Sequence, residues 1–176
     1  RIDPQVIACD MHPGYAATAM ARRMAESQGV RLVEVQHHHA HVASCMAEHG
    51  IECPVIGLAC DGSGWGTDGT VWGLEALVVG PDGFERVGHL APVPLPGGEA
   101  AVREPWRMAL TYLWLASEEG MPWPEGLPVV VRHQDEWPVL LQMVRGGLNS
   151  PMASSAGRLF DAVSALLDLG DVNAYE

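Results

Sequence analysis

The first fifty residues alternate between short apolar runs and amphipathic stretches, and this alternation most constrains the fold. The apolar run at 6–9 predicts a short buried strand, and 31–36 is predicted to be a second strand. Each precedes a stretch with helical periodicity, at about 15–28 and about 37–49, and a glycine follows both stretches. Strand, helix, strand, helix at this spacing predicts an α/β unit with parallel neighbouring strands.

The pattern changes near Glu52, where a β-meander followed by helices begins. Strands are expected at 55–60, 70–79 and 84–90, the last two joined by the turn-forming sequence Pro81-Asp82-Gly83. Helices are expected at about 100–117, at about 134–145, and from the capping residues Ser154 and Ser155 to Gly170. We therefore predict two regions, 1–52 and 53–176.

Two of the expected helices carry apolar stripes that we predict to be buried. In the first helix the stripe consists of Ala16, Ala19, Met20 and Met24. In the last helix it consists of Leu159, Phe160, Val163, Leu166 and Leu167.

The charge balance excludes several functions. The net charge is −12, and all ten basic residues are arginines. An acidic chain is a poor match for nonspecific nucleic-acid binding, so we expect no nucleic-acid partner. Without lysine, the chain holds neither a Walker-type phosphate-loop lysine nor a Schiff-base lysine.

Cellular location is indicated by the apolar runs and the cysteines. No run approaches the roughly 18 apolar residues of a membrane span, so no membrane association is expected. The cysteines, none of which form a CxxC pair, are Cys9, Cys45, Cys53 and Cys60. Reduced thiols in a cytoplasmic protein are therefore expected, with Cys9 and Cys60 buried in strand-like runs.

A histidine cluster at 37–41 is a candidate metal site. His37 and His41 are four residues apart, so on a helix both imidazoles leave the same face and can bind one metal ion. His38 and His39 lie on other faces and are weaker candidates. The HExxH motif is absent because His38 stands in the glutamate position, which argues against a zinc peptidase.

A glycine-rich segment follows the apolar run that ends at Cys60. Asp61 begins it, and Gly62, Gly64, Gly66 and Thr67 follow. A carboxylate at a strand end followed by such a turn can serve both a metal and a phosphate chain. A β-hairpin with glycines at its turn is the alternative.

Four further groups of residues could belong to a functional site. Arg103 and Arg107 would share one helical face and could hold an anion, or could form surface salt bridges. Gly157 and Arg158 lie at an expected helix N-terminus, which can hold an anion or be a plain cap. Asp161 is either a site carboxylate or an exposed helix residue. Asp10 and His12 follow the first strand, where α/β sheets place functional groups.

Taken together, five motifs resemble the HypF-type carbamoyltransferase of NiFe-hydrogenase maturation. The matching runs are ACDMHPGY, VQHHHAHVASCMAEHG, DGSGWGTDGTVWG, LPGGEAAVREPWRMAL and NSPMASSAGRLFDAVSALL, followed by AYE at the end of the chain. They occur in order and cover most of the sequence. The resemblance implies a partial Kae1-like α/β fold of the actin-like ATPase class (ASKHA, ribonuclease H-like). Residues 1–52 would end lobe I, and 53–176 would begin lobe II.

The resemblance also implies a reaction for the parent protein. Carbamoyl phosphate and ATP, with Mg²⁺, would form carbamoyl-adenylate in a separate YrdC-like domain. The Kae1-like domain would transfer the carbamoyl group to the C-terminal cysteine of HypE, the precursor of the cyanide ligands of the hydrogenase. The 176-residue chain alone is expected to be inactive.

Site residues carry over by position. His37, His41 and Asp61 match the family's iron or zinc ligands, and the fourth ligand, a later aspartate, has no counterpart here. The segments expected to contact nucleotide contain Gly62, Gly64, Gly66, Thr67, Gly157, Arg158 and Asp161. No catalytic residue is assigned.

Three alternatives remain open at this point. The chain could belong to another Kae1-like enzyme, an O-carbamoyltransferase or the tRNA threonylcarbamoyltransferase. The tRNA enzymes usually carry Glu-Gly in place of His39-Ala40, which favours HypF. The chain could instead be a non-catalytic metal-binding fragment, or a metallohydrolase with an open metal position and a general base.

Overall fold

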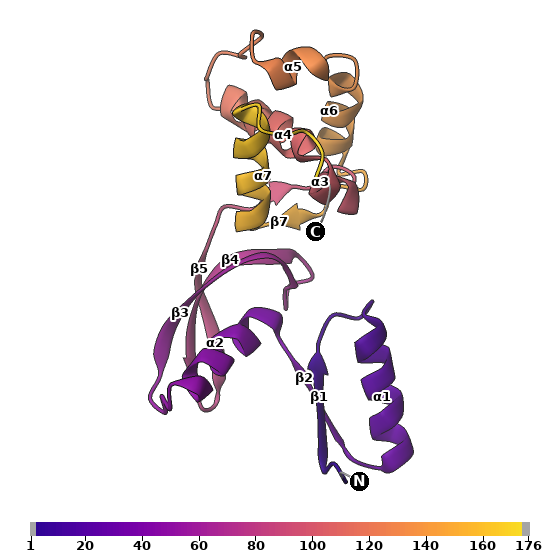
Figure 1. Cartoon of the computed structure of the whole chain (residues 1–176), viewed down its shortest axis with the longest axis vertical. Coiled ribbons are helices and arrows are strands. Elements are labelled where there is room, and N and C mark those ends of the chain that lie inside the picture. The colour runs from indigo at the N-terminus through magenta and orange to yellow at the C-terminus, as the bar shows by residue number, and fades with distance from the viewer. Residues whose placement is uncertain (1–2, 174–176) are drawn as a thin grey trace. The chain divides into compact units, whose positions relative to one another are not determined.

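The alternation predicted for the first fifty residues is present in a computed structural model of the chain, which describes residues 3–173. The closing AYE motif, residues 174–176, lies outside the described residues. Strands β1 (Val6–Asp10) and β2 (Arg31–Val35) pair in parallel, with Asp10 opposite Val35. Helices α1 (Ala16–Gln28) and α2 (His37–Glu48) follow them (Figure 1).

The chain divides into two units, which are described separately. The first contains residues up to 59 and 64–89; the second contains 60–63 and the residues from 90 onward. Strand β3 therefore contributes residues to both units. The predicted lobe boundary at 52/53 stays a prediction.

Helix α1 buries a different face from the one predicted. Its buried residues are Thr18, Ala21 and Ala25, whereas Met20 is 55% exposed. The buried side chains are small, so the helix lies close to β1, and the Thr18 hydroxyl donates a 2.8 Å hydrogen bond to the Asp10 carbonyl. The predicted stripe was wrong because hydrophobicity alone favoured the large methionines over these small residues.

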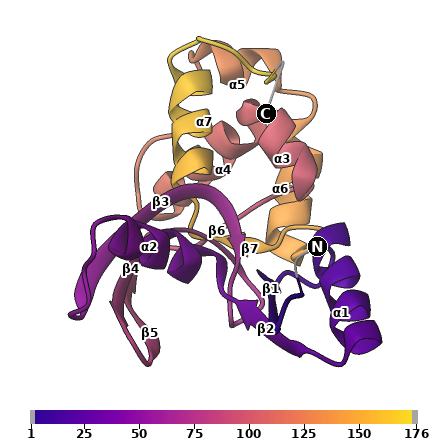
Figure 2. The same cartoon turned by 60° about the horizontal axis from the view of Figure 1, so that its bottom comes forward.

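The meander of the first unit consists of β3 (Val55–Trp65), β4 (Val71–Gly80) and β5 (Gly83–His89). Strand β4 pairs with β3, and it pairs antiparallel with β5 across the predicted turn at 81–83 (Figure 2). Strand β3 is longer than predicted, because Asp61 to Trp65 continue the strand. The buried core of this unit comprises Val42, Trp72, Leu77 and Val79.

The second unit is mainly helical. Its helices are α3 (Glu99–Arg103), α4 (Pro105–Glu118), α5 (Pro128–Arg132), α6 (Trp137–Gly146) and α7 (Ala156–Leu166). Two short strands, β6 (Val93–Pro94) and β7 (Met152–Ala153), pair antiparallel. The buried core contains Trp106, Ala109, Leu110, Val129, Val130, Leu140 and Ala165.

Prolines explain where the predicted helices of this unit were wrong. The helix expected at 100–117 is two helices, because Pro105 cannot continue a preceding helix and Glu104 before it has a non-helical ψ of 78°. Pro128 and Pro138 each occupy the first turn of a helix, which proline tolerates. As a result α5 went unpredicted, and α6 starts three residues later than expected.

Helix α7 also buries small residues. Ala156, Ala162 and Ala165 are buried, whereas Phe160 is 71% exposed and Val163 and Leu167 are also exposed. The predicted stripe was therefore wrong for those three residues, and the helix ends at Leu166, before Gly170.

The cysteines and the membrane prediction can be compared with the structure. All four cysteines are free, but neither cysteine predicted to be buried is so: Cys9 is half-buried and Cys60 is exposed. Within residues 3–173, no helix combines the length and apolar character that crossing a bilayer requires.

Candidate metal centre

Gln36 fixes the start of the histidine helix. Its side-chain oxygen caps α2 by accepting a 2.8 Å hydrogen bond from the His39 backbone N–H. Its side-chain nitrogen donates to the Trp65 carbonyl at 3.1 Å. Because Gln36 is 2% exposed, this pair of contacts holds the first turn of α2 against β3.

His37 and His41 face one another as the i, i+4 spacing predicts. Their Nε2 atoms are 3.2 Å apart. Two nitrogens bound to a tetrahedral zinc ion at about 2.0–2.1 Å would be roughly 3.3 Å apart. The two rings are thus spaced as a pair of metal ligands.

Asp61 lies close to this pair. One potential ligand atom from each of His37, His41 and Asp61 lies within 4.8 Å of the others. His41 is exposed, and the other two are half-buried. The structure therefore brings together the three residues that the sequence predicted as ligands.

Asp61 occupies the interior of β3, where a strand end was predicted. Its Oδ1 accepts a 2.6 Å hydrogen bond from the Gly62 N–H. The strand continues through Gly62 and Gly64, and at Gly64 two histidines approach the backbone closely. A Cβ atom on Gly64 would lie 2.6 Å from Cε1 of His38 and 2.8 Å from Cδ2 of His37.

Asp10 and His12 lie beside the first histidine. Asp10 Oδ2 is 2.8 Å from His37 Nδ1, and Oδ1 accepts a 2.7 Å hydrogen bond from the His12 N–H. The His12 ring stacks on Tyr15 at 4.0 Å and meets Trp65 edge-on at 5.0 Å. The convergence of Asp10 with His37 depends on the register in which β1 pairs with β2, which the sequence alone does not specify.

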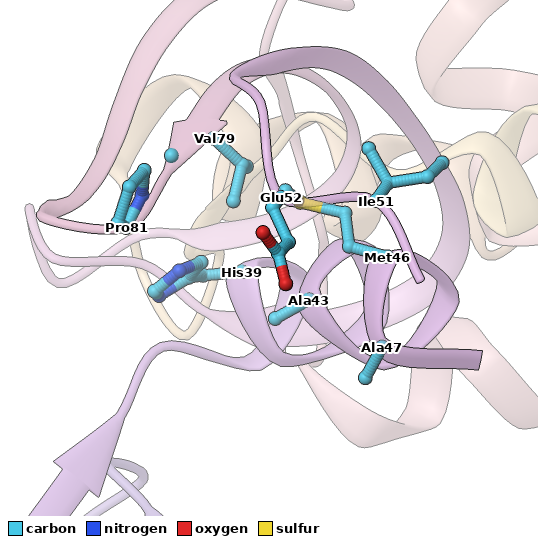
Figure 3. A pocket seen from close by; sticks show the side chains of 9 residues that line it. His39, Ala43, Met46, Ala47, Ile51, Glu52, Val79 and Pro81 are labelled. Carbon is cyan, nitrogen blue, oxygen red and sulfur yellow. The ribbon is translucent and has the colours of Figure 1, made fainter. Parts of the chain in front are cut away.

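The other histidines of α2 face elsewhere. His38 is fully buried, and its Nδ1 lies 3.2 Å from the Gln36 side-chain nitrogen. His39 lines an open cavity of about 540 Å³ together with Met46, Glu52, Val79 and neighbouring residues (Figure 3). At 100° per residue this cavity faces the side of α2 opposite His37 and His41, so it is distinct from the metal centre.

The predicted phosphate-binding turn lies at the junction of β3 and β4. Gly66 N–H donates to the Thr70 carbonyl at 2.9 Å, and Thr67 is exposed. A Cβ atom on Gly66 would overlap the Trp72 indole. A side-chain network that sequence reasoning missed supports this turn.

Asp68 is the centre of that network. Its Oδ1 accepts hydrogen bonds from Thr70 and from the Trp72 indole, and its Oδ2 lies 3.2 Å from Arg86. Arg86 also pairs with the buried Glu75 at 2.6 Å and covers the Trp72 ring. Burial opposes ionisation of Asp68, but these hydrogen bonds and the Arg86 charge outweigh it and lower its pKa.

The start of α7 contains the remaining nucleotide candidates. The Ser155 hydroxyl caps the helix by accepting from the Arg158 N–H at 3.1 Å, and it donates to the Gly62 carbonyl at 2.5 Å. A Cβ atom on Gly157 would stand 2.9 Å from the Gly62 Cα, so only glycine fits there. Arg158 pairs with Asp161 at 2.5 Å.

Arg103 and Arg107 do not share a helix. Arg103 ends α3 and pairs with Glu99 at 3.2 Å, while Arg107 belongs to α4 and pairs with Glu104. The structure thus shows the salt-bridge alternative for both arginines. The shared helical face was a wrong prediction because the helix breaks at Pro105.

Two family models match the chain. Residues 1–48 match the model described as the HypF Kae1-like domain. Residues 57–176 match the model described as the carbamoyltransferase Kae1-like domain, second subdomain. All three candidate ligands lie within these ranges.

Curated relatives carry the same family description. The carbamoyltransferase HypF2 of Cupriavidus necator is 45% identical over 175 residues, which is 99% of this chain and 21% of the relative. The carbamoyltransferase HypF of Rhizobium leguminosarum bv. viciae is 40% identical over 178 residues, 99% of this chain and 22% of the relative. The chain thus spans about a fifth of these proteins.

Solved structures agree with the sequence matches. A full-length HypF in a phosphate- and nucleotide-bound form aligns with a TM-score of 0.84 at 41% identity, covering 100% of this chain and 26% of that one. HypF of T. kodakarensis aligns with a TM-score of 0.85 at 38% identity, covering 100% of this chain and 24% of that one.

Proposed function

This chain belongs to the HypF carbamoyltransferase family, and we propose that it forms the metal-binding part of the carbamoyl-transfer site of a longer enzyme. Its expected α/β fold, part of a Kae1-like domain of the actin-like class, is confirmed by the structural matches. The family assignment favours HypF over the O-carbamoyl- and tRNA threonylcarbamoyl-transferases. The observation that carries the proposal is the convergence of His37, His41 and Asp61 within 4.8 Å.

The donor set fits a divalent iron or zinc ion. Two imidazoles and one carboxylate are a set found with both metals, in catalytic zinc sites and in non-haem iron sites. When bound, such an ion supplies Lewis-acid polarisation of a substrate oxygen. The three side chains would hold the ion, and exposure of His41 leaves that side of the group accessible.

Nucleotide binding is proposed for the glycine turn and for the start of α7. The turn, residues 66–70, is closed by hydrogen bonds that the Gly66, Gly69 and Thr70 N–H groups donate within the turn. Its glycines permit close approach of a phosphate to the exposed backbone at 67–69. At α7, Gly157 and Arg158 lie at a helix N-terminus, which favours anions. The nucleotide bound by these two segments would be either ATP as its Mg²⁺ complex or carbamoyl-adenylate.

In the reaction proposed for the whole protein, the acceptor of the carbamoyl group is a cysteine thiol. Carbamoyl phosphate and ATP would yield carbamoyl-adenylate elsewhere in the longer chain. The C-terminal cysteine sulfur of HypE would attack the carbamoyl carbon, forming the carbon–sulfur bond while the bond to AMP breaks. The free cysteines of the chain support a cytoplasmic location for this chemistry.

Transfer by the full-length protein tests the proposal. We expect ATP turnover that depends on carbamoyl phosphate, and transfer of labelled carbamoyl groups to HypE. The double variant His37→Ala plus His41→Ala should lose transfer by at least about tenfold. The matched control, His39→Ala, removes an imidazole from the opposite face of α2 and should retain it. Absence of carbamoyl-phosphate-dependent turnover, or normal transfer by the double variant, would refute the proposal.

A further inference from the structure

Asp10, which is not one of the three candidate metal ligands, contacts one of them, His37, directly. Asp10 Oδ2 lies 2.8 Å from Nδ1 of His37, while Nε2 of the same ring faces His41 at 3.2 Å. The two nitrogens of one imidazole are thus divided between a carboxylate and the metal centre.

This division determines where the His37 proton must lie. A carboxylate oxygen only accepts hydrogen bonds, so the Nδ1 atom that faces it carries the hydrogen. The Nε2 atom, which faces His41, then carries the lone pair that binding to a metal ion requires. Carboxylates that hold metal-binding histidines in this way fix the ring orientation and raise the basicity of the ligand.

Two hydrogen bonds and the strand pairing hold Asp10 in place. Its carboxylate accepts from the His12 N–H at 2.7 Å, and its carbonyl accepts from the buried Thr18 hydroxyl at 2.8 Å. Strand pairing places Asp10 opposite Val35, two residues before His37. Asp10 therefore approaches His37 from a rigid strand end.

We propose that Asp10 is the positioning residue of the metal centre, and that it keeps His37 in the Nδ1–H tautomer, in which Nε2 carries the lone pair that a metal ion needs. This inference rests on the proposed metal site. It assigns Asp10 no contact with the metal or the substrate.

An asparagine at this position makes the proposal sharply testable. Asparagine offers one acceptor oxygen and one donor NH₂ group, whereas Asp10 accepts from two donors. The His12 backbone N–H cannot become an acceptor, but an imidazole can change tautomer. The Asp10→Asn amide should therefore donate to His37 Nδ1 and move the ring proton to Nε2, which blocks the ligand atom.

Two measurements on the full 176-residue chain test this. The first is the Kd for Zn²⁺ alone, by competition with a chromophoric chelator. We expect Asp10→Asn and Asp10→Ala to bind about 10- to 100-fold more weakly. The control Glu34→Gln removes an exposed β2 carboxylate that pairs with Arg22, and it should stay within about twofold of the wild type.

The second measurement reads the tautomer without metal. Nitrogen-15 NMR of the histidine rings, assigned with His37→Ala, should show Nδ1 protonated in the wild type and Nε2 protonated in Asp10→Asn. Wild-type Zn²⁺ affinity in both Asp10 variants, or an unchanged tautomer in Asp10→Asn, would overturn the inference. If Asp10→Ala fails to fold, Asp10→Asn decides alone. A wild-type chain that binds no Zn²⁺ would instead refute the proposed metal site, while the metal-free tautomer comparison would still decide whether Asp10 controls His37.

Discussion

Gly64 lies directly against His37: a Cβ atom on the glycine would stand 2.9 Å from the Cβ of the histidine. Real Cβ atoms do not approach this closely, so any side chain at position 64 must displace the first turn of α2. The glycine-rich sequence of β3 thus serves the packing of the histidine helix as well as the turn that follows.

We predict that Gly64→Ala weakens Zn²⁺ binding by on the order of tenfold, because it displaces His37. Overpacking should also lower the free energy of unfolding by about 1–3 kcal/mol. Chelator competition and urea denaturation measure the two effects. Gly62→Ala is the matched control on the same strand, since a Cβ atom there meets nothing within 4 Å. Equal Zn²⁺ affinities in the two variants would contradict the prediction.

Ser155→Ala should lower the free energy of unfolding by about 1–2 kcal/mol, because it removes the cap of α7 and the hydrogen bond to the Gly62 carbonyl. Denaturant midpoints measure the change. Ser164→Ala, inside the same helix, should be neutral or slightly stabilising because alanine is the better helix former. A Ser155→Ala protein as stable as the Ser164→Ala protein would show that the cap contributes nothing.

Acidic pH should lower the free energy of unfolding of the second unit through protonation of Asp171. Hydrogen bonds from Arg132 lower the pKa of this carboxyl, burial opposes the shift, and His133 adds to the lowering. Because the folded pKa is below the unfolded value, the stabilisation is complete above about pH 4 and is lost as the pH falls through the folded pKa.

Asp171→Asn should therefore lower the free energy of unfolding by about 1 kcal/mol at pH 7, with a smaller difference at pH 3. Urea denaturation at the two pH values measures this. A difference that stays constant or grows on acidification would contradict the assigned sign.

The sequence allowed the order of most elements to be predicted, but their extents and buried faces depended on tertiary contacts. Asp61 to Trp65 read as a turn because of their glycines, yet they form strand because Gly64 accommodates two histidines. The stripes of α1 and α7 were misplaced because alanines, rather than the larger Met20 and Phe160, face the core.

The candidate site was predictable only where it depends on local sequence spacing. The i, i+4 spacing of His37 and His41 is a local property of a helix, so it could be read directly. The contact of Asp10 with His37 depends on the register of two parallel strands, which has no local signature. Gln36 was overlooked as well, although its position just before the helix is where a capping side chain belongs.

The central claim is that His37, His41 and Asp61 bind a metal ion, and metal content tests it most directly. The chain, purified anaerobically, loaded with zinc or iron and freed of excess metal, is compared with the variant His37→Ala plus His41→Ala by elemental analysis. We predict about one metal ion per wild-type chain, since three protein ligands suffice for an open site, and almost none in the variant. A wild-type chain without metal, or a double variant that keeps it, would contradict the account.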